Sequence, residues 1–187
     1  IQDAKQQILR SYSNKDIIHI IIKNYKINNV DYDFLSTEIN CNLLSLDIIF
    51  ICLPKNIIRG LKELFVKFNV SVNQISLSSY AKSLNYKNDF LTNENTAYID
   101  MGYNKTCIIY YKKNNISSFN VIPIGGNHIT KDLSKILDVD LITAEKIKLT
   151  FDKDAKILNE KNLSVEFVQK IIFARIEEIL ELCLKSI

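Results

Sequence analysis

The sequence lacks the cysteine and histidine spacing of a zinc site. Its four cysteines form no C-x-x-C pair, and none has a histidine at zinc-ligand spacing. Three of them, Cys52, Cys107 and Cys183, lie in apolar runs, where a free thiol packs as a small hydrophobic group. The pattern therefore predicts structural cysteines in a reducing compartment rather than a secreted disulfide framework.

A strong net charge, a signal peptide and a long apolar run are also missing. The net charge of +3 does not indicate a general nucleic-acid surface. The apolar run Ile17–Ile22 is far shorter than the roughly 20 residues that a membrane-spanning helix needs. Glycine and proline are scarce, and no repeat or low-complexity tract occurs. The 187 residues suffice for one large domain or two small ones. Because the chain begins at Ile1 and ends in a helical pattern, we expect an excerpt of a longer protein.

The first half predicts a small α/β module. Its expected elements are a helix at 3–12, strands at 16–22 and 45–53, a helix from Pro54, a strand or extended link at 70–78 and a helix followed by a loop at 79–91. The polar segment 24–44 between the two strands has room for one or two short strands. Apolar residues at helical spacing after Pro54 form one stripe: Ile57, Ile58, Leu61, Leu64, Phe65 and Phe68.

The second half predicts an antiparallel meander and then helices. Strands are expected at 97–100, 106–111 and 117–124, and helices near 127–137, 141–149 and 164–185. A loop or small hairpin is expected at 152–162. The apolar spacing assigns the following core face to the last helix: Val165, Val168, Ile172, Ile176, Ile179 and Cys183.

Two glycine turns carry the functional signal. Asp100 closes one strand, and a turn containing Gly102 leads to Thr106 in the next strand. Such a turn can direct backbone N–H groups at a phosphate, and the nearby carboxylate can hold Mg²⁺. Taken alone, Asp-x-Gly between strands is more often a plain hairpin turn. The second turn, at Gly125 and Gly126, opens a helix whose N-terminus favours an anion, although it also fits an ordinary strand-to-helix turn. Two such turns together indicate a nucleotide site.

A charged pair follows on the next helix. Glu145 and Lys148 lie three residues apart and share one helix face. Two interpretations are equally open: hydrogen bonds to a ribose, or an exposed ion pair of little energetic value.

These motifs resemble a known protein family. The run Tyr98–Gly102 through Thr106 resembles the second phosphate motif of the actin and DnaK-type ATPase fold. The run Ile122–Leu133 is similar to the bacterial cell-division family FtsA, and Ala144–Lys148 has the spacing of the A-E-x-I-K motif of FtsA and MreB. The resemblance implies an α/β (α+β elements) fragment of that fold, a ribonuclease-H-like mixed sheet preceded by a small α/β subdomain. By position, 1–75 corresponds to the FtsA-specific subdomain 1C, 76–137 to subdomain 2A and 138–187 to the start of 2B.

The resemblance also implies ligands. It assigns ATP to a set of nine residues and Mg²⁺ to Asp100, held through water. The nine residues are Gly102, Tyr103, Asn104, Lys105, Thr106, Gly125, Gly126, Glu145 and Lys148. The family pattern D-x-G-G-G-T-T differs here, since Tyr103 and Asn104 replace two glycines. Backbone N–H groups need no particular side chain, so nucleotide binding remains expected, with weak or no ATP hydrolysis and no catalytic residue assigned.

The function implied is that of an ATP-binding cell-division adaptor. Such a protein links FtsZ to the inner membrane, recruits divisome proteins and self-associates. It is cytoplasmic and peripheral at the division site, with a membrane segment outside this chain and no nucleic-acid partner. Three alternatives stay open: a PilM-like pilus-assembly adaptor, a nucleotide-free interaction protein with a decayed motif, and a sugar-kinase-type phosphotransferase. The last needs a catalytic aspartate that faces a sugar pocket, and no candidate is evident beyond Asp100.

Overall fold

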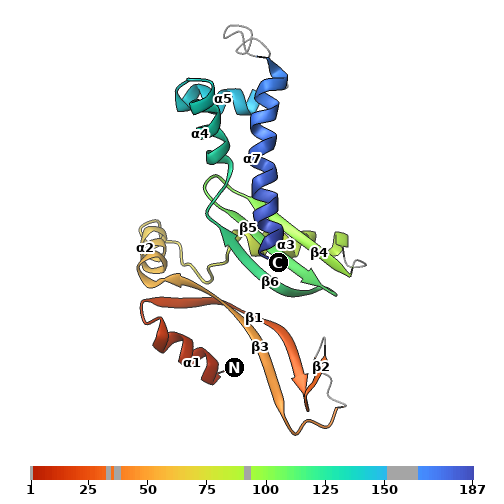
Figure 1. Ribbon diagram of the computed structural model, residues 1–187. Helices are drawn as coiled ribbons and strands as arrows, with labels where there is room; N and C mark the ends of the chain where they lie inside the picture. Colours follow the sequence, from red (N-terminus) through yellow and green to blue (C-terminus); the bar gives the residue numbers. More distant parts are fainter. Residues whose placement is uncertain (1, 33–34, 36–38, 91–93, 151–163) are drawn as a thin grey trace. The chain divides into compact units, whose positions relative to one another are not determined.

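The computed structural model describes residues 2–32, 35, 39–90, 94–150 and 164–187. The chain forms two compact units, whose elements are labelled in Figure 1. The first comprises residues 1–96 with 111–117, and the second comprises residues 97–110 with 118–187. The subdomain boundaries expected after residues 75 and 137 stay predictions.

The first unit contains an antiparallel sheet in the order β2-β1-β3. Its strands are β1 (Lys15–Ile27), β2 (Val30–Tyr32) and β3 (Leu44–Pro54). The β1–β3 pairing runs from Lys15 opposite Pro54 to Ile27 opposite Leu44. The strands expected at 16–22 and 45–53 are therefore confirmed, but β1 is longer than its β-branched run suggested. The β1–β2 turn uses two asparagines with positive φ, Asn28 and Asn29, which tolerate this geometry better than most residues.

Three α-helices accompany this sheet: α1 (Gln2–Ser11), α2 (Lys55–Val66) and α3 (Ser78–Tyr86), the last followed by the 3₁₀ turn η1 (Lys87–Phe90). Pro54 ends β3 and is the N-cap of α2, so this helix begins one residue later than expected. Residues 70–77 have no regular secondary structure. They are tied to β1 by His19, whose Nε2 accepts a hydrogen bond of 3.1 Å from the Leu77 N–H. Burial lowers the pKa of His19, which favours the neutral ring that this contact requires.

The second sheet has the order β4-β5-β6. Its strands are β4 (Asn95–Met101), β5 (Thr106–Lys112) and β6 (Asn115–Ile122). The short connections require antiparallel neighbours, because a parallel pair needs a crossover of a dozen or more residues. Lys113 and Asn114 both have positive φ, as a two-residue hairpin turn requires. The expected meander is confirmed.

Among the described residues, three helices complete the second unit: α4 (Gly126–Ile136), α5 (Leu141–Thr150) and α7 (Val165–Lys185). Helix α4 contacts both α5 and α7 (Figure 1). Ser164 caps α7 by accepting a hydrogen bond from the Phe167 N–H. Their shared core contains Ile129, Leu133, Ala144, Ile147, Val168, Ile171 and Ile172. The predicted core face of α7 is largely confirmed, but Val165 is 39% exposed and Ile171 is buried instead. The loop or hairpin expected at 152–162 lies outside the described residues.

Candidate functional site

The turn between β4 and β5 is short and open. The Gly102 N–H donates to the Lys105 carbonyl over 2.9 Å, which closes the turn. Gly102, Tyr103, Asn104 and Lys105 are all exposed, and Asp100 lies half-buried in β4 just before them. The predicted phosphate motif is thus an accessible corner of the second unit.

The second glycine turn packs directly against the first. A Cβ atom added to Gly125 would lie 2.3 Å from the Gly102 carbonyl oxygen and 2.8 Å from that of Tyr103. Only glycine leaves room for this approach, although its φ of −161° is open to any residue. The two turns that the sequence singled out therefore meet in one place.

Hydrogen bonds fasten this contact. The Gly126 N–H donates to the Gly102 carbonyl over 2.9 Å, and the Asn127 N–H donates to the Tyr103 carbonyl over 2.7 Å. The Asn127 amide also donates to Asn104 Oδ1 over 3.0 Å. The N-terminus of α4 was expected to attract an anion, but its first N–H groups are directed at protein carbonyls. Gly125 and Gly126 therefore hold the phosphate turn, and their contact with the nucleotide stays a prediction.

His128 and Thr106 support the same corner. The Gly125 N–H donates to His128 Nδ1 over 3.2 Å. Thr106 is fully buried, and its hydroxyl donates to the Ile124 carbonyl over 2.7 Å. Thr106 thus ties β5 to the strand end that precedes Gly125. Its direct contact with phosphate stays a prediction that this geometry does not favour.

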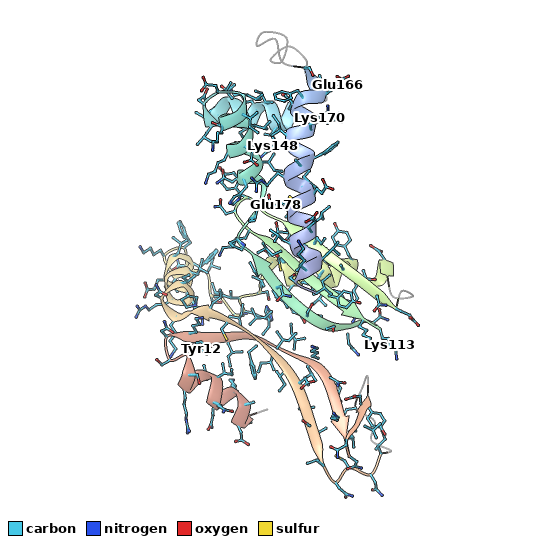
Figure 2. All side chains as sticks on the ribbon, in the orientation of Figure 1. Tyr12, Lys113, Lys148, Glu166, Lys170 and Glu178 are labelled. Atoms are coloured by element: carbon cyan, nitrogen blue, oxygen red, sulfur yellow. The ribbon has the colours of Figure 1, made fainter. Side chains whose placement is uncertain are left out.

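Glu145 and Lys148 form a partly buried ion pair that connects α5 to the start of α4. Lys148 Nζ donates to Glu145 Oε2 over 2.7 Å, to Thr130 Oγ1 over 2.9 Å and to the Gly126 carbonyl over 3.2 Å. These three bonds use all three ammonium donors. Figure 2 labels Lys148 on α5. The pair therefore connects α5 to the start of α4, and its contact with a ribose stays a prediction.

Thr130 is the member of this network that the sequence did not indicate. Its side chain is 2% exposed, and its hydroxyl also hydrogen-bonds to Glu145 Oε2. Burial by itself raises the pKa of Glu145, but the hydrogen bonds from Lys148 and Thr130, with the charge of Lys148, together lower it below its usual value. Glu145 is thus held as a carboxylate. Nothing in the sequence around Thr130 indicates that its hydroxyl would hydrogen-bond to Glu145 and Lys148.

A pocket of about 340 Å³ opens beside the phosphate turn. Its lining combines apolar side chains with one carboxylate and one ammonium group: Tyr103, Leu141, Ile142, Glu145, Lys146 and Leu149. Tyr103 is 61% exposed, so its ring stands at the rim of this pocket rather than filling the turn. The size and the mostly apolar lining suit part of a small ligand such as a base and its sugar. Together, the open turn and this pocket fit a nucleotide.

The candidate site offers few protein ligands for a metal ion. No group of three or more His, Cys, Asp or Glu side chains suited to a metal ion occurs among the described residues. A magnesium ion at Asp100 would therefore need water and phosphate oxygens to complete its coordination, which is usual for Mg²⁺.

Comparison with solved structures defines the class of protein. A chain of the PilM-PilN type IV pilus biogenesis complex has a TM-score of 0.63 over 91% of this chain and 48% of its own length, at 13% identity. The chain is an actin-like ATPase fold fragment. At this identity, the likeness shows the fold alone.

Sequence comparison then shows which proteins the chain is similar to. Residues 97–172 match the family model for cell division protein FtsA. FtsA of Helicobacter pylori (strain 26695) is 29% identical over 52% of this chain and 20% of its own length. Bacillus subtilis FtsA is 28% identical over 68% of this chain and 32% of its own length. Agrobacterium fabrum FtsA is 24% identical over 96% of this chain and 44% of its own length. The chain is similar to these FtsA proteins and spans less than half the length of each of the three.

Proposed function

We propose that this chain is part of an actin-like cell-division adaptor that binds ATP at the corner formed by its two glycine turns. The single observation that carries the proposal is the packing of Gly125 against the Gly102 carbonyl, beside a pocket of nucleotide-compatible lining. The FtsA family match covers this corner and Glu145 with Lys148. The cell-division role comes from the names of the homologues.

The proposed contacts with the nucleotide are made by exposed residues of the turn after β4 and of the pocket beside it. The turn from Tyr103 to Lys105 supplies backbone N–H groups and the Lys105 ammonium to the phosphates. Asp100 holds Mg²⁺ through water, and the bound ion neutralises phosphate charge. The base rests against Tyr103 and Ile142 at the pocket.

The roles of Glu145 and Lys148 differ. The Glu145 carboxylate accepts a hydrogen bond from the sugar, since its side chain is 35% exposed. Lys148, which is 15% exposed and fully hydrogen-bonded, positions Glu145 and the start of α4 instead of touching the ligand. The family resemblance assigns both Glu145 and Lys148 to the nucleotide, whereas this proposal gives the direct contact to Glu145.

ATP in this proposal is a ligand that favours one arrangement of the protein. A ligand that binds only one state shifts the population toward it, so ATP would act as an assembly switch. The proposed partners are FtsZ, other divisome proteins and further copies of the same protein, at the inner face of the cell membrane.

Isothermal titration calorimetry of the chain with ATP and Mg²⁺ tests the ligand. We expect saturable binding that weakens about tenfold in Ile142→Asp. The new carboxylate replaces an apolar wall of the pocket, and the bound nucleotide would have to desolvate it. Ile142 is 71% exposed, so the change leaves the core intact. Leu184→Asp, at a residue 66% exposed on α7, is the matched control and keeps the parental affinity. Absence of heat for the parent would defeat the ligand assignment and favour a nucleotide-free interaction protein.

A second experiment separates FtsA-like from PilM-like function. Fluorescence anisotropy with a labelled C-terminal FtsZ peptide, and in parallel a short pilus-protein peptide, measures which partner binds. The proposal expects the FtsZ peptide to bind more tightly. Tighter binding of the pilus peptide would move the assignment to the PilM-like alternative, whose fold is equally compatible with this chain.

A further inference from the structure

Helix α2 presents an apolar face that the described residues leave uncovered. No residue of α2 is buried, its main contact among the described elements is with β3, and Ile58 is half-buried. The stripe continues into the residues just after the helix, and Phe68 is the most exposed of its members at 72%. Its other exposed members are Ile57, Leu61, Leu64 and Phe65. An exposed apolar surface of this kind marks an interaction site.

The charges around this stripe have one dominant sign. Residues 55–68 contain four basic side chains, Lys55, Arg59, Lys62 and Lys67, against the single acidic Glu63. All four basic side chains are exposed. At about 100° per residue, Lys62 and Lys67 lie on the two flanks of the stripe. Their aliphatic stems can therefore follow apolar surface while their ammonium groups reach outward.

This combination argues for a lipid surface over a protein partner. Protein–protein interfaces are depleted in lysine relative to the rest of the protein surface. A helix with Phe, Leu and Ile on one face and Lys or Arg on the other is the type that lies flat in the headgroup region of a bilayer. No helix among the described residues is long and apolar enough to cross a membrane. An in-plane contact thus accounts for both the apolar stripe and the flanking lysines.

We propose that α2, with the residues up to Phe68, binds the surface of bilayers that contain anionic lipids. The contact is independent of the nucleotide site and of the membrane segment expected outside this chain. The stripe inserts among the headgroups, and Lys62 and Lys67 attract the negative surface. Because the attraction is electrostatic as well as apolar, it weakens as salt shortens the Debye length.

Vesicle flotation with the full chain tests this proposal. The probe is a vesicle of phosphatidylglycerol and phosphatidylcholine in equal parts, compared with pure phosphatidylcholine. The expected result is flotation with the anionic vesicles, with at least about tenfold weaker binding for Leu64→Glu. The matched control is Leu184→Glu, another exposed leucine on a helix, which should float as the parent does. Circular dichroism checks that each variant is folded.

A second pair of variants leaves the apolar stripe untouched. Lys62→Gln and Lys67→Gln should each weaken binding to anionic vesicles about fivefold, and added salt should reduce the difference. Equal binding to both vesicle types, or binding to neither, overturns the proposal. So does concentration-dependent dimerisation, seen by analytical ultracentrifugation, that Leu64→Glu abolishes while vesicle binding is absent. In that case a second copy covers the stripe.

Discussion

The carbonyl oxygen of Gly102 lies so close to Gly125 that a Cβ atom there would come within 2.3 Å of it. The Gly126 N–H donates to the same carbonyl oxygen. This contact joins the turn after β4 to the start of α4, and the candidate site depends on it.

Replacement of Gly125 by alanine should therefore force the two turns apart. We expect a loss of about 1–3 kcal/mol in the free energy of unfolding, because the obstructing atoms are backbone and cannot move aside singly. Urea denaturation followed by circular dichroism measures the change. Gly60→Ala in α2 is the control, since nothing lies within 4 Å of its added Cβ. That change should stabilise slightly, because alanine is the better helix former. Equal effects at both positions would contradict the close packing described.

The buried hydroxyl of Thr130 should contribute to stability through Lys148 and Glu145. Thr130→Val keeps the shape but removes the hydrogen-bond partner, so we expect a loss of about 1–2 kcal/mol in unfolding free energy. Thr150→Val is the matched control. The Thr150 hydroxyl donates to the Lys146 carbonyl within the same exposed helical turn, so its loss should cost less. If Thr130→Val costs no more than Thr150→Val, then the network has no structural role.

Glu145 gives the network a pH dependence of defined sign. Its pKa is lowered in the folded protein from the ordinary value of 4.5, so the folded state binds a proton there less readily than the unfolded chain. The resulting stabilisation is complete above that ordinary value and is lost as the pH falls through the folded pKa. Glu145→Gln should therefore flatten the decline in urea midpoint between neutral and acidic pH. A matched control is Glu181→Gln, in the exposed pair with Lys185. Parallel curves for the parent and Glu145→Gln would refute the assignment.

Arg175 and Asp132 connect α7 to α4 through two parallel hydrogen bonds, of 2.5 Å from Nε and 3.0 Å from Nη2. Arg175→Lys keeps the charge but loses the paired geometry, so we expect a loss of roughly 1 kcal/mol in unfolding free energy. Arg59→Lys is the matched control, because Arg59 lies 4.0 Å from Glu63 with both side chains mostly exposed. That exchange should be close to neutral. A thermal melt of both variants against the parent checks the difference.

Much of the secondary structure was predictable because it depends on local patterns. Runs rich in β-branched and apolar residues predicted β1 and β3, and apolar spacing after Ser164 predicted α7. The ends were less predictable, since β1 extends to Ile27 only because β3 offers a partner that far. The exposure of the α2 stripe was also outside the reach of sequence, because periodicity identifies a face but not what covers it.

The candidate site was predictable in location but not in chemistry. Gly102 and Gly125 stand out from the sequence because one follows Asp100 at a strand end and the other opens a helix, and two such turns together indicate a nucleotide site. Whether the N–H groups of Gly126 and Asn127 face a ligand or a protein carbonyl depends on how two distant turns pack. The role of Thr130 likewise arises from a contact between α4 and α5 that spacing along one helix cannot show.

The backbone amide spectrum of the chain, recorded by NMR during titration with ATP and Mg²⁺, tests the central claim most directly. The account predicts saturable shifts at Tyr103, Asn104 and Lys105 and around Glu145, while the amides of Gly126 and Asn127 keep their hydrogen-bonded positions. Shifts that appear instead in the first unit, or none at saturating nucleotide, would contradict it.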